Sequence, residues 1–228
     1  MFIKIIKRIF YFFFSDKFSV FYLKSYSQEG EDMILNKLLE CENQGFYIDI
    51  GSHHPKRFSN TYFFYKKGWA GINIDAKPGS MKIFNKKRPR DINIEVGVSS
   101  KEEIINFYMF NEPALNTFDE SLANSRTSDK YHIIETVSVN CMSLNGILEQ
   151  YLPANIKITF LTIDIEGYDL KVLATNDWNK YRPEYLIVES YELYIEKVTE
   201  SDIYKYLTEK NYKLVSKSYY SLIFKNSL

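Results

Sequence analysis

The sequence has few cysteines, no run of apolar residues long enough to cross a membrane, and no excess of charge of either sign. Cys41 and Cys141 lie far apart without the spacing of a zinc site or a disulfide framework, which favours a protein of the reducing cytoplasm. Lys and Arg number 29, as do Asp and Glu, so we expect no nucleic-acid partner. The composition, 45% hydrophobic and 25% charged, is that of a globular protein, and the length is typical of one domain.

The first 24 residues differ in composition from the rest, being basic and rich in aromatic side chains. Lys4, Lys7 and Arg8 interrupt the apolar segment 1–14, which is too short to span a bilayer and is not followed by a signal-peptide cleavage site. These three residues fall on one side of a helical wheel, as in a helix lying on the inner face of a membrane. A helix docked on its own domain or on a partner subunit fits the pattern as well. We expect a helical segment at 1–24 and one domain at 25–228.

From residue 46 onward, short apolar runs alternate with stretches of helical pattern. Runs that are apolar on both faces suit buried parallel strands, and strand–helix alternation is typical of a doubly wound α/β sheet. The predicted strands are 46–50, 71–75, 92–96, 160–165 and 185–189, and the predicted helices are 60–67, 79–87, 143–151 and 169–174. The segments 104–110 and 136–140 look like an inserted pair of strands, and 212–216 with 221–224 predict a hairpin that adds an antiparallel edge.

The turn after the first strand carries the first functional signal. In open α/β sheets the ligand lies beyond the carboxyl ends of the strands. Gly51 ends the first strand and can let the backbone approach a ligand closely, with Asp49 or the turn amides holding a polar group beside it. A dinucleotide pyrophosphate needs several glycines, but here Ser52, two histidines and a proline follow the single glycine. A pyrophosphate site is therefore disfavoured.

Asp75 ends the second predicted strand about 20 residues past the glycine, where an acid bonds ribose hydroxyls. A ribose-binding acid without a pyrophosphate cradle favours an adenosine that carries no phosphates. S-adenosylmethionine meets that description. A nicotinamide-dependent sugar oxidoreductase is the alternative, because its cofactor also contains an adenosine ribose.

The order and spacing of several motifs resemble those of the FkbM-type S-adenosylmethionine-dependent methyltransferases. The motifs are YSQEGED (26–32), FYIDIGSHHP (46–55), SNT (59–61), GW (68–69), GINID (71–75), NIEVGVS (93–99), LTIDIEGY (161–168) and PEYLIVE (183–189). The resemblance implies a class I methyltransferase (Rossmann-like) fold that methylates a hydroxyl, usually of a sugar or a polyketide-derived substrate. Asp75 departs from the glutamate more common in the family but keeps the carboxylate.

The predicted cofactor contacts follow the first three strands. They are Asp49, Gly51, Ser52, Asn60, Thr61, Asp75, Ala76, Val98 and Ser99. Asn60 and Thr61 can bond the methionine carboxylate or the acceptor, and backbone amides around Val98 and Ser99, in the turn after the third strand, are expected to border the adenine. Gln28, Glu29 and Glu31 are expected to form a lid over the cofactor or the start of a helix at Ser27.

Methyl transfer to a hydroxyl requires the loss of a proton, and histidine titrates near neutral pH. His53 and His54 follow the first strand directly, so we predict that one of them contacts the substrate or acts as the base. The alternative is a turn held by a histidine hydrogen bond. Arg57, a few residues on, is a candidate for binding a carboxylate or phosphate of the substrate.

Two carboxylates end the fourth strand and form the second set of catalytic candidates. If the strand persists, Asp164 and Glu166 share a face, since side chains alternate. They can act as base, bind sugar hydroxyls or hold Mg²⁺, the use we do not favour; Glu166 can instead cap the next helix. Glu189, at the end of the fifth strand, is a possible third member that binds substrate.

We therefore predict a cytoplasmic S-adenosylmethionine-dependent O-methyltransferase whose acceptor is a hydroxyl of a small molecule or glycan, in a polysaccharide or secondary-metabolite pathway. A catalytically inactive module that binds a membrane surface through residues 1–14 is the alternative outside enzymology.

Overall fold

The structure, a computed structural model, describes residues 23–228. The predicted helix at the N-terminus, with its membrane contact through residues 1–14, lies outside the described residues. Within residues 23–228, no helix is both long enough and apolar enough to cross a membrane.

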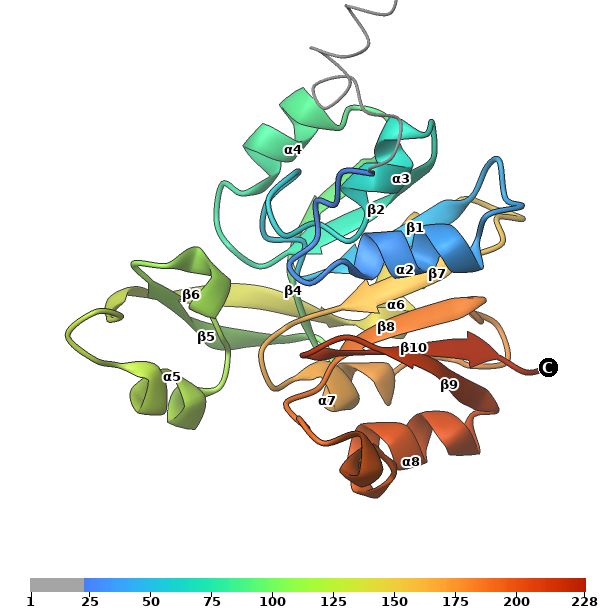
Figure 1. Ribbon diagram of the computed structural model, residues 1–228. Coiled ribbons are helices and arrows are strands. Elements are labelled where there is room, and N and C mark those ends of the chain that lie inside the picture. The colour runs from blue at the N-terminus through green and yellow to red at the C-terminus, as the bar shows by residue number, and fades with distance from the viewer. Residues whose placement is uncertain (1–22) are drawn as a thin grey trace, which may run out of the picture.

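A mostly parallel sheet forms the centre of the molecule (Figure 1). Its seven strands follow the order β3-β2-β1-β7-β8-β10-β9. Their bounds are β1 Phe46–Ile50, β2 Ala70–Asp75, β3 Ile92–Glu95, β7 Phe160–Ile163, β8 Tyr185–Glu189, β9 Tyr212–Lys217 and β10 Ser221–Asn226. Strands β1, β2, β3, β7 and β8 run parallel, whereas β10 is antiparallel to both β8 and β9. This confirms the Rossmann-like α/β prediction, including the antiparallel C-terminal hairpin.

Helices cover both faces of this sheet, as a doubly wound fold requires. One face packs against α2 (Glu31–Leu38) and α3 (Tyr62–Lys66). The other packs against α6 (Leu144–Tyr151), α7 (Asp169–Leu173) and α8 (Asp202–Glu209), the last preceded by a short 3₁₀ helix at Ile195–Glu200. Another helix, α4 (Met81–Lys87), connects β2 to β3.

Side chains along each strand alternate between the two faces of the main sheet, so the strands contribute to the hydrophobic core on both faces. Tyr47 faces the α2–α3 side, whereas Ile48 and Ile50 face the α6–α8 side. Trp69 is 1% exposed and packs against Phe64 and Phe160 in the core on the α2–α3 side. The order of the strands reverses between β1 and β7, and that switch point is where open α/β sheets bind ligands.

A second, three-stranded sheet forms an arm that projects from the main sheet, at the left of Figure 1. It contains β4 (Gly97–Ser99), β5 (Glu103–Phe110) and β6 (Ile133–Ser143), together with the 3₁₀ helix Pro113–Leu115 and α5 (Glu120–Arg126). The predicted inserted strands correspond to β5 and β6, which pair antiparallel. The predicted turn at 95–99 is wrong, because the chain leaves the main sheet after Glu95 and Gly97–Ser99 pairs parallel with β6.

Candidate functional site

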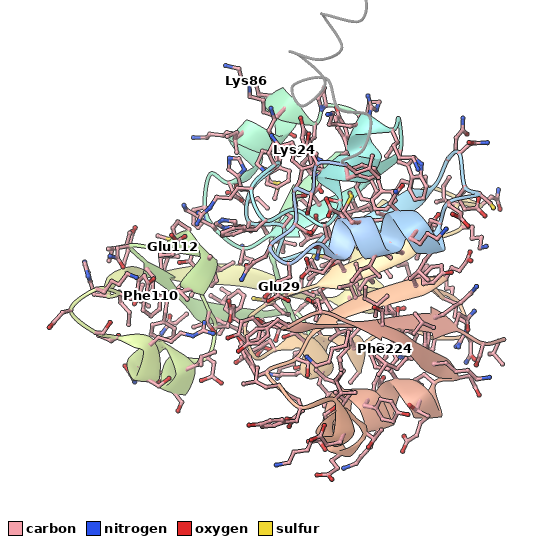
Figure 2. All side chains as sticks on the ribbon, viewed as in Figure 1. Lys24, Glu29, Lys86, Phe110, Glu112 and Phe224 are labelled. Carbon is pink, nitrogen blue, oxygen red and sulfur yellow. The ribbon has the colours of Figure 1, made fainter. Side chains whose placement is uncertain are left out.

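A cavity opens at the carboxyl ends of β1, β2, β7 and β8, between the main sheet and the arm. The strand order divides its lining into two halves. One half follows β1 and β2 and includes Gly51, His53, Asp75 and Ala76; because the sequence predicts cofactor contacts there, we call it the cofactor half. The other half follows β7, β8 and the β9–β10 turn, and we call it the acceptor half after the residues predicted to face the acceptor. Figure 2 labels Glu29, which precedes α2, and Phe110 and Glu112 on the arm.

The turn after β1 is pinned to its neighbouring strands. The backbone N–H groups of Gly51 and Ser52 donate to the Ile74 carbonyl at 2.9 and 3.0 Å, and the Ser52 hydroxyl donates to the same oxygen at 3.2 Å. Gly51 has φ 79°, and a Cβ there would lie 1.9 Å from the Asp164 carbonyl oxygen. A glycine is therefore required for the β1 and β7 turns to meet.

Asp75 lies at the end of β2, inside the cavity. One carboxylate oxygen accepts from the His53 N–H and the other from the Lys77 N–H, each at 2.8 Å. Burial raises the pKa of Asp75, and these two hydrogen bonds oppose that rise. Each oxygen has a second lone pair, so the carboxylate can also accept from both hydroxyls of a ribose.

The two histidines point in different directions. His53 lines the cavity, has φ 49°, and its buried Nε2 has no hydrogen-bond partner. Burial and the nearby Arg57 lower the pKa of His53 to about 4, so its imidazole is neutral at physiological pH. His54 does not line the cavity; its Nδ1 accepts from the backbone N–H groups of Lys56 and Arg57 at 3.1 and 2.9 Å. His54 thus holds the turn.

Asp49 lines the cavity from β1 and is fixed from behind. The Thr61 hydroxyl donates to Asp49 Oδ2 at 2.5 Å, and Arg88 Nη2 donates to Thr61 Oγ1 at 2.9 Å. Thr61 is fully buried and does not reach the cavity, whereas Asn60 does and donates to the Thr162 hydroxyl at 2.9 Å. Burial raises the pKa of Asp49 to about 6, and Arg88 and the Thr61 hydroxyl limit the rise.

Arg88, the cation that contacts Asp49 through Thr61, was not predicted from the sequence. Arg88 is 0% exposed; its Nε donates to Asp91 Oδ2 at 2.7 Å and its Nη2 to the Tyr47 hydroxyl at 2.8 Å. In the sequence it belongs to the run KKRPR at 86–90, which reads as a solvated surface patch. No local signal distinguishes the buried arginine from its exposed neighbours.

Three carboxylates meet in the acceptor half. Asp164, Glu166 and Glu189 each place one oxygen within 4.8 Å of the other two. They do not meet by strand alternation, because β7 ends at Ile163 and Glu166 has φ 53°. The prediction that this strand continues to residue 165 is wrong, but the turn still brings the carboxylates together.

Burial and mutual repulsion shift the protonation of this carboxylate cluster. Both causes raise the pKa of Asp164, whose side chain is enclosed by protein on most sides yet exposed toward the cavity. They raise the pKa of Glu189 to about 10, and its buried Oε2 has no hydrogen-bond partner. Glu189 is therefore protonated at neutral pH. Asp169 lies under the turn, accepts from the Ile165 N–H at 3.4 Å, and has its pKa raised to about 7 by burial.

Glu166 is held by two side chains that were not predicted. Arg126, from α5 in the arm, donates to Glu166 Oε2, and the Tyr191 hydroxyl donates to the same oxygen at 2.6 Å. The arm also supplies Thr117, whose hydroxyl donates to the Glu166 carbonyl at 3.0 Å. Arg126 and Tyr191 are far from Glu166 in sequence, so only the fold shows that they meet.

Arg57 and Ser99 lie outside the cavity. Arg57 forms a bidentate ion pair with Glu112 of the arm, at 3.1 and 3.2 Å, so it joins the segment after β1 to the arm. The Ser99 hydroxyl is fully buried and donates to Glu103 Oε1 at 2.7 Å, whereas Val98 does line the cavity.

The segment before α2 forms part of the cavity wall. Gln28, Glu29 and Glu31 all line it, and α2 begins at Glu31 rather than near Ser27. Glu29 Oε2 accepts from the Ser218 hydroxyl at 2.8 Å and from the Tyr220 N–H at 2.7 Å. The segment is thus fastened to the β9–β10 turn.

Comparison with family models matches residues 49–214, more than half of the chain, to the methyltransferase FkbM domain. The comparisons with curated proteins and with solved structures give no significant match. The matched span begins at Asp49 and contains the strand-end residues of both halves of the cavity. The chain therefore belongs to the FkbM-domain methyltransferase family.

Proposed function

We propose that the protein is an S-adenosylmethionine-dependent O-methyltransferase that methylates a hydroxyl of a sugar in a glycan or a secondary metabolite. The observation that carries this proposal is the divided cavity, with Asp75 at one end and the Asp164–Glu166–Glu189 carboxylates at the other. The reaction needs both features, because it requires a ribose-binding acid and a group that takes a proton.

The residues of the cofactor half fit an adenosine without phosphates. Asp75 would accept from the ribose hydroxyls, Val98 would border the base, and Asp49 would face the ammonium of the amino-acid portion. Asn60 adds an amide beside that portion. The turn after β1 is fixed by Ile74 and Asp164 rather than left open for a pyrophosphate, which supports methyl transfer over nicotinamide chemistry.

The cofactor supplies a methyl group on a sulfonium, which is a good leaving group, so alignment of the acceptor provides much of the rate. For the acceptor oxygen to take that methyl group, the hydroxyl would have to give up its proton to the protein. Asp164 is the proposed base, because it faces the cavity and because burial and the neighbouring carboxylates raise its pKa, which makes it a stronger base. Glu166, fixed by Arg126 and Tyr191, positions the hydroxyl; protonated Glu189 donates to the substrate.

The histidines have lesser roles in this proposal. His53 presents a neutral imidazole to the cavity and can contact the substrate, but its low pKa makes it a weak base. His54 holds the turn through its Nδ1. No step requires a metal, although the carboxylate cluster offers the oxygen ligands that Mg²⁺ takes.

Calorimetric titration with S-adenosylmethionine and S-adenosylhomocysteine, with and without Mg²⁺, tests the cofactor class. We expect saturable binding of both without the metal, and none of NAD. Transfer of a labelled methyl group to hydroxyl-bearing glycosides then tests the reaction. A folded protein that binds NAD but neither methyl-donor compound contradicts the proposal.

A further inference from the structure

Three tyrosine rings lie beside the acceptor half of the cavity, and we call them the aromatic rim: Tyr220 in the β9–β10 turn, which lines the cavity, and Tyr191 after β8 and Tyr219 in the same turn, which pack against Tyr220. The Tyr191 and Tyr220 ring centroids are 6.0 Å apart at 62°, and those of Tyr219 and Tyr220 are 4.5 Å apart at 76°. The Ser190 N–H joins the two loops by donating to the Tyr220 carbonyl at 2.7 Å. Tyr191 is 52% exposed and Tyr219 is 58% exposed, so flat apolar faces remain uncovered at the mouth.

The rim is continuous with the proposed catalytic carboxylates. The Tyr191 hydroxyl donates to Glu166 Oε2 at 2.6 Å, and Tyr220 itself lines the cavity. Glu29 fixes the turn that bears the other rings through Ser218 and the Tyr220 N–H. One ring of the rim thus contacts the carboxylate cluster directly, and the turn that bears the other two is held in place.

The charge of the acceptor half opposes anionic ligands. Its acidic residues are Glu29, Glu31, Asp164, Glu166 and the protonated Glu189. Two cations lie nearby: Arg126 is already paired with Glu166, and Lys217 Nζ donates to the Ser218 and Tyr219 carbonyls of the β9–β10 turn. Among the described cavity-lining residues, the one lysine, Lys77, follows β2 in the cofactor half. A phosphate or carboxylate beside the reacting hydroxyl would meet like charge, whereas a neutral hydroxyl meets hydrogen-bond acceptors.

Taking the proposed O-methyl transfer as its basis, we propose that the acceptor is an uncharged carbohydrate already joined to its chain or aglycone, with one ring face lying on the aromatic rim. A pyranose presents C–H groups on its faces and hydroxyls around its edge. The exposed tyrosines match the faces, and the carboxylates match the edge. A nucleotide-activated or phosphorylated sugar would bring its anionic group into the acidic half.

The proposal also orders the reactions. Glycosyl transfer releases the phosphate-bearing leaving group of an activated sugar, and what remains is a neutral glycoside. A glycosyl transfer reaction must therefore supply the substrate of this site, and methylation follows it.

Saturation-transfer NMR on the full chain with S-adenosylhomocysteine tests the proposal. The probes are matched sets of common hexoses and 6-deoxyhexoses, each offered as the methyl glycoside, the 1-phosphate and the nucleoside diphosphate sugar. We expect saturation transfer to neutral glycosides and binding at least about tenfold weaker for their charged counterparts. Tyr219→Ala should weaken glycoside binding about tenfold, because that exposed ring packs on Tyr220, which lines the cavity. Tyr194→Ala is the matched control, since Tyr194 is 60% exposed and lies on the Tyr191 loop but is not part of the aromatic rim.

Two outcomes would overturn the proposal while leaving methyl transfer intact. One is preferential binding or methylation of a phosphorylated or nucleotide-activated sugar. The other is normal S-adenosylhomocysteine binding with no saturation transfer to any neutral glycoside, or with transfer unaffected by Tyr219→Ala. Failure to bind S-adenosylhomocysteine would instead contradict the methyltransferase function on which the proposal rests.

Discussion

The backbone N–H of His53 donates to the Asp75 carboxylate at 2.8 Å, which fastens the loop after β1 to the end of β2. The two residues are 22 positions apart, yet they share one side of the cavity. The carboxylate proposed to bind the ribose therefore also sets the shape of the turn beside it. Such a site is preorganised, so less ordering is required when a ligand binds.

Replacing Asp75 tests both roles. Asp75→Ala should weaken S-adenosylhomocysteine binding by about tenfold or more, since it removes hydrogen bonds to a charged acceptor. Asp75→Asn keeps one acceptor oxygen and should retain more affinity. Calorimetry measures both, with circular dichroism to verify folding. Unchanged affinity in folded Asp75→Ala would remove Asp75 from the cofactor site.

Glu166→Gln should impair turnover more than cofactor binding. The amide retains an oxygen for Tyr191 but loses the charge opposite Arg126, so the acceptor hydroxyl is positioned less accurately and kcat should fall by about 10²-fold. Steady-state methyl transfer and calorimetry separate the two effects. Glu102→Gln, an exposed acid of the arm, is the control. Full activity in Glu166→Gln would leave Glu166 only the task of joining the arm to the turn.

Thr61→Val should make cofactor binding more sensitive to acid. The hydroxyl helps to keep Asp49, whose pKa is raised to about 6, ionised; Arg88 acts in the same sense, while Asp75, Asp91 and Asp164 oppose it. Without the hydroxyl the pKa rises further. Affinity should therefore fall near pH 7 and recover at higher pH, whereas Thr61→Ser should resemble the wild type.

A pH series of S-adenosylhomocysteine titrations measures this shift. An equal loss of affinity at every pH in Thr61→Val would show that the hydroxyl affects packing rather than the charge of Asp49.

Arg88→Met should destabilise the fold by roughly 3–5 kcal/mol, because it leaves the buried Asp91 carboxylate without its cation. Denaturant unfolding monitored by tryptophan fluorescence measures the loss. Lys86→Met is the matched control: Lys86 comes from the same basic run and is exposed at the end of α4, as Figure 2 shows. Similar stabilities for the two variants would contradict the structural role of Arg88.

Glu189→Gln should increase stability at neutral and alkaline pH. The folded protein keeps the Glu189 proton up to a pKa of about 10, whereas the unfolded chain releases it near the ordinary value of 4.5. The contribution of Glu189 to the free energy of unfolding is thus complete at low pH and is lost as the pH rises from about 4.5 to about 10. Glutamine removes this loss, which for these pKa values is at most about 5 kcal/mol at pH 8, and makes little difference at pH 4. Glu196→Gln, on an exposed 3₁₀ turn, should show no such trend.

The main sheet could be predicted from the sequence because its strands are short, apolar on both faces and bounded by turns. The arm was harder. Gly97–Ser99 is three residues long and pairs with a strand some 40 positions later, so the local sequence does not separate it from a turn.

The residues of the candidate site also divide into those that the local sequence locates and those that it does not. Gly51, Asp75, Asp164 and Glu189 end strands, and the end of a strand can be located in a sequence. The contacts of Arg88, Arg126 and Tyr191 depend on tertiary packing, and nothing adjacent to these residues in the chain indicates it.

The position of β10 between β8 and β9 has a consequence for biosynthesis. Until residues 221–226 have left the ribosome, β8 is an open edge and β9 has no partner, so the nascent chain holds an incomplete sheet with exposed backbone groups. Tyr219 and Tyr220 of the aromatic rim directly precede this segment and are synthesised just before it. The main sheet therefore cannot be completed before residue 226 has been synthesised, and a chain released before residue 221 should be a target for chaperones or proteases.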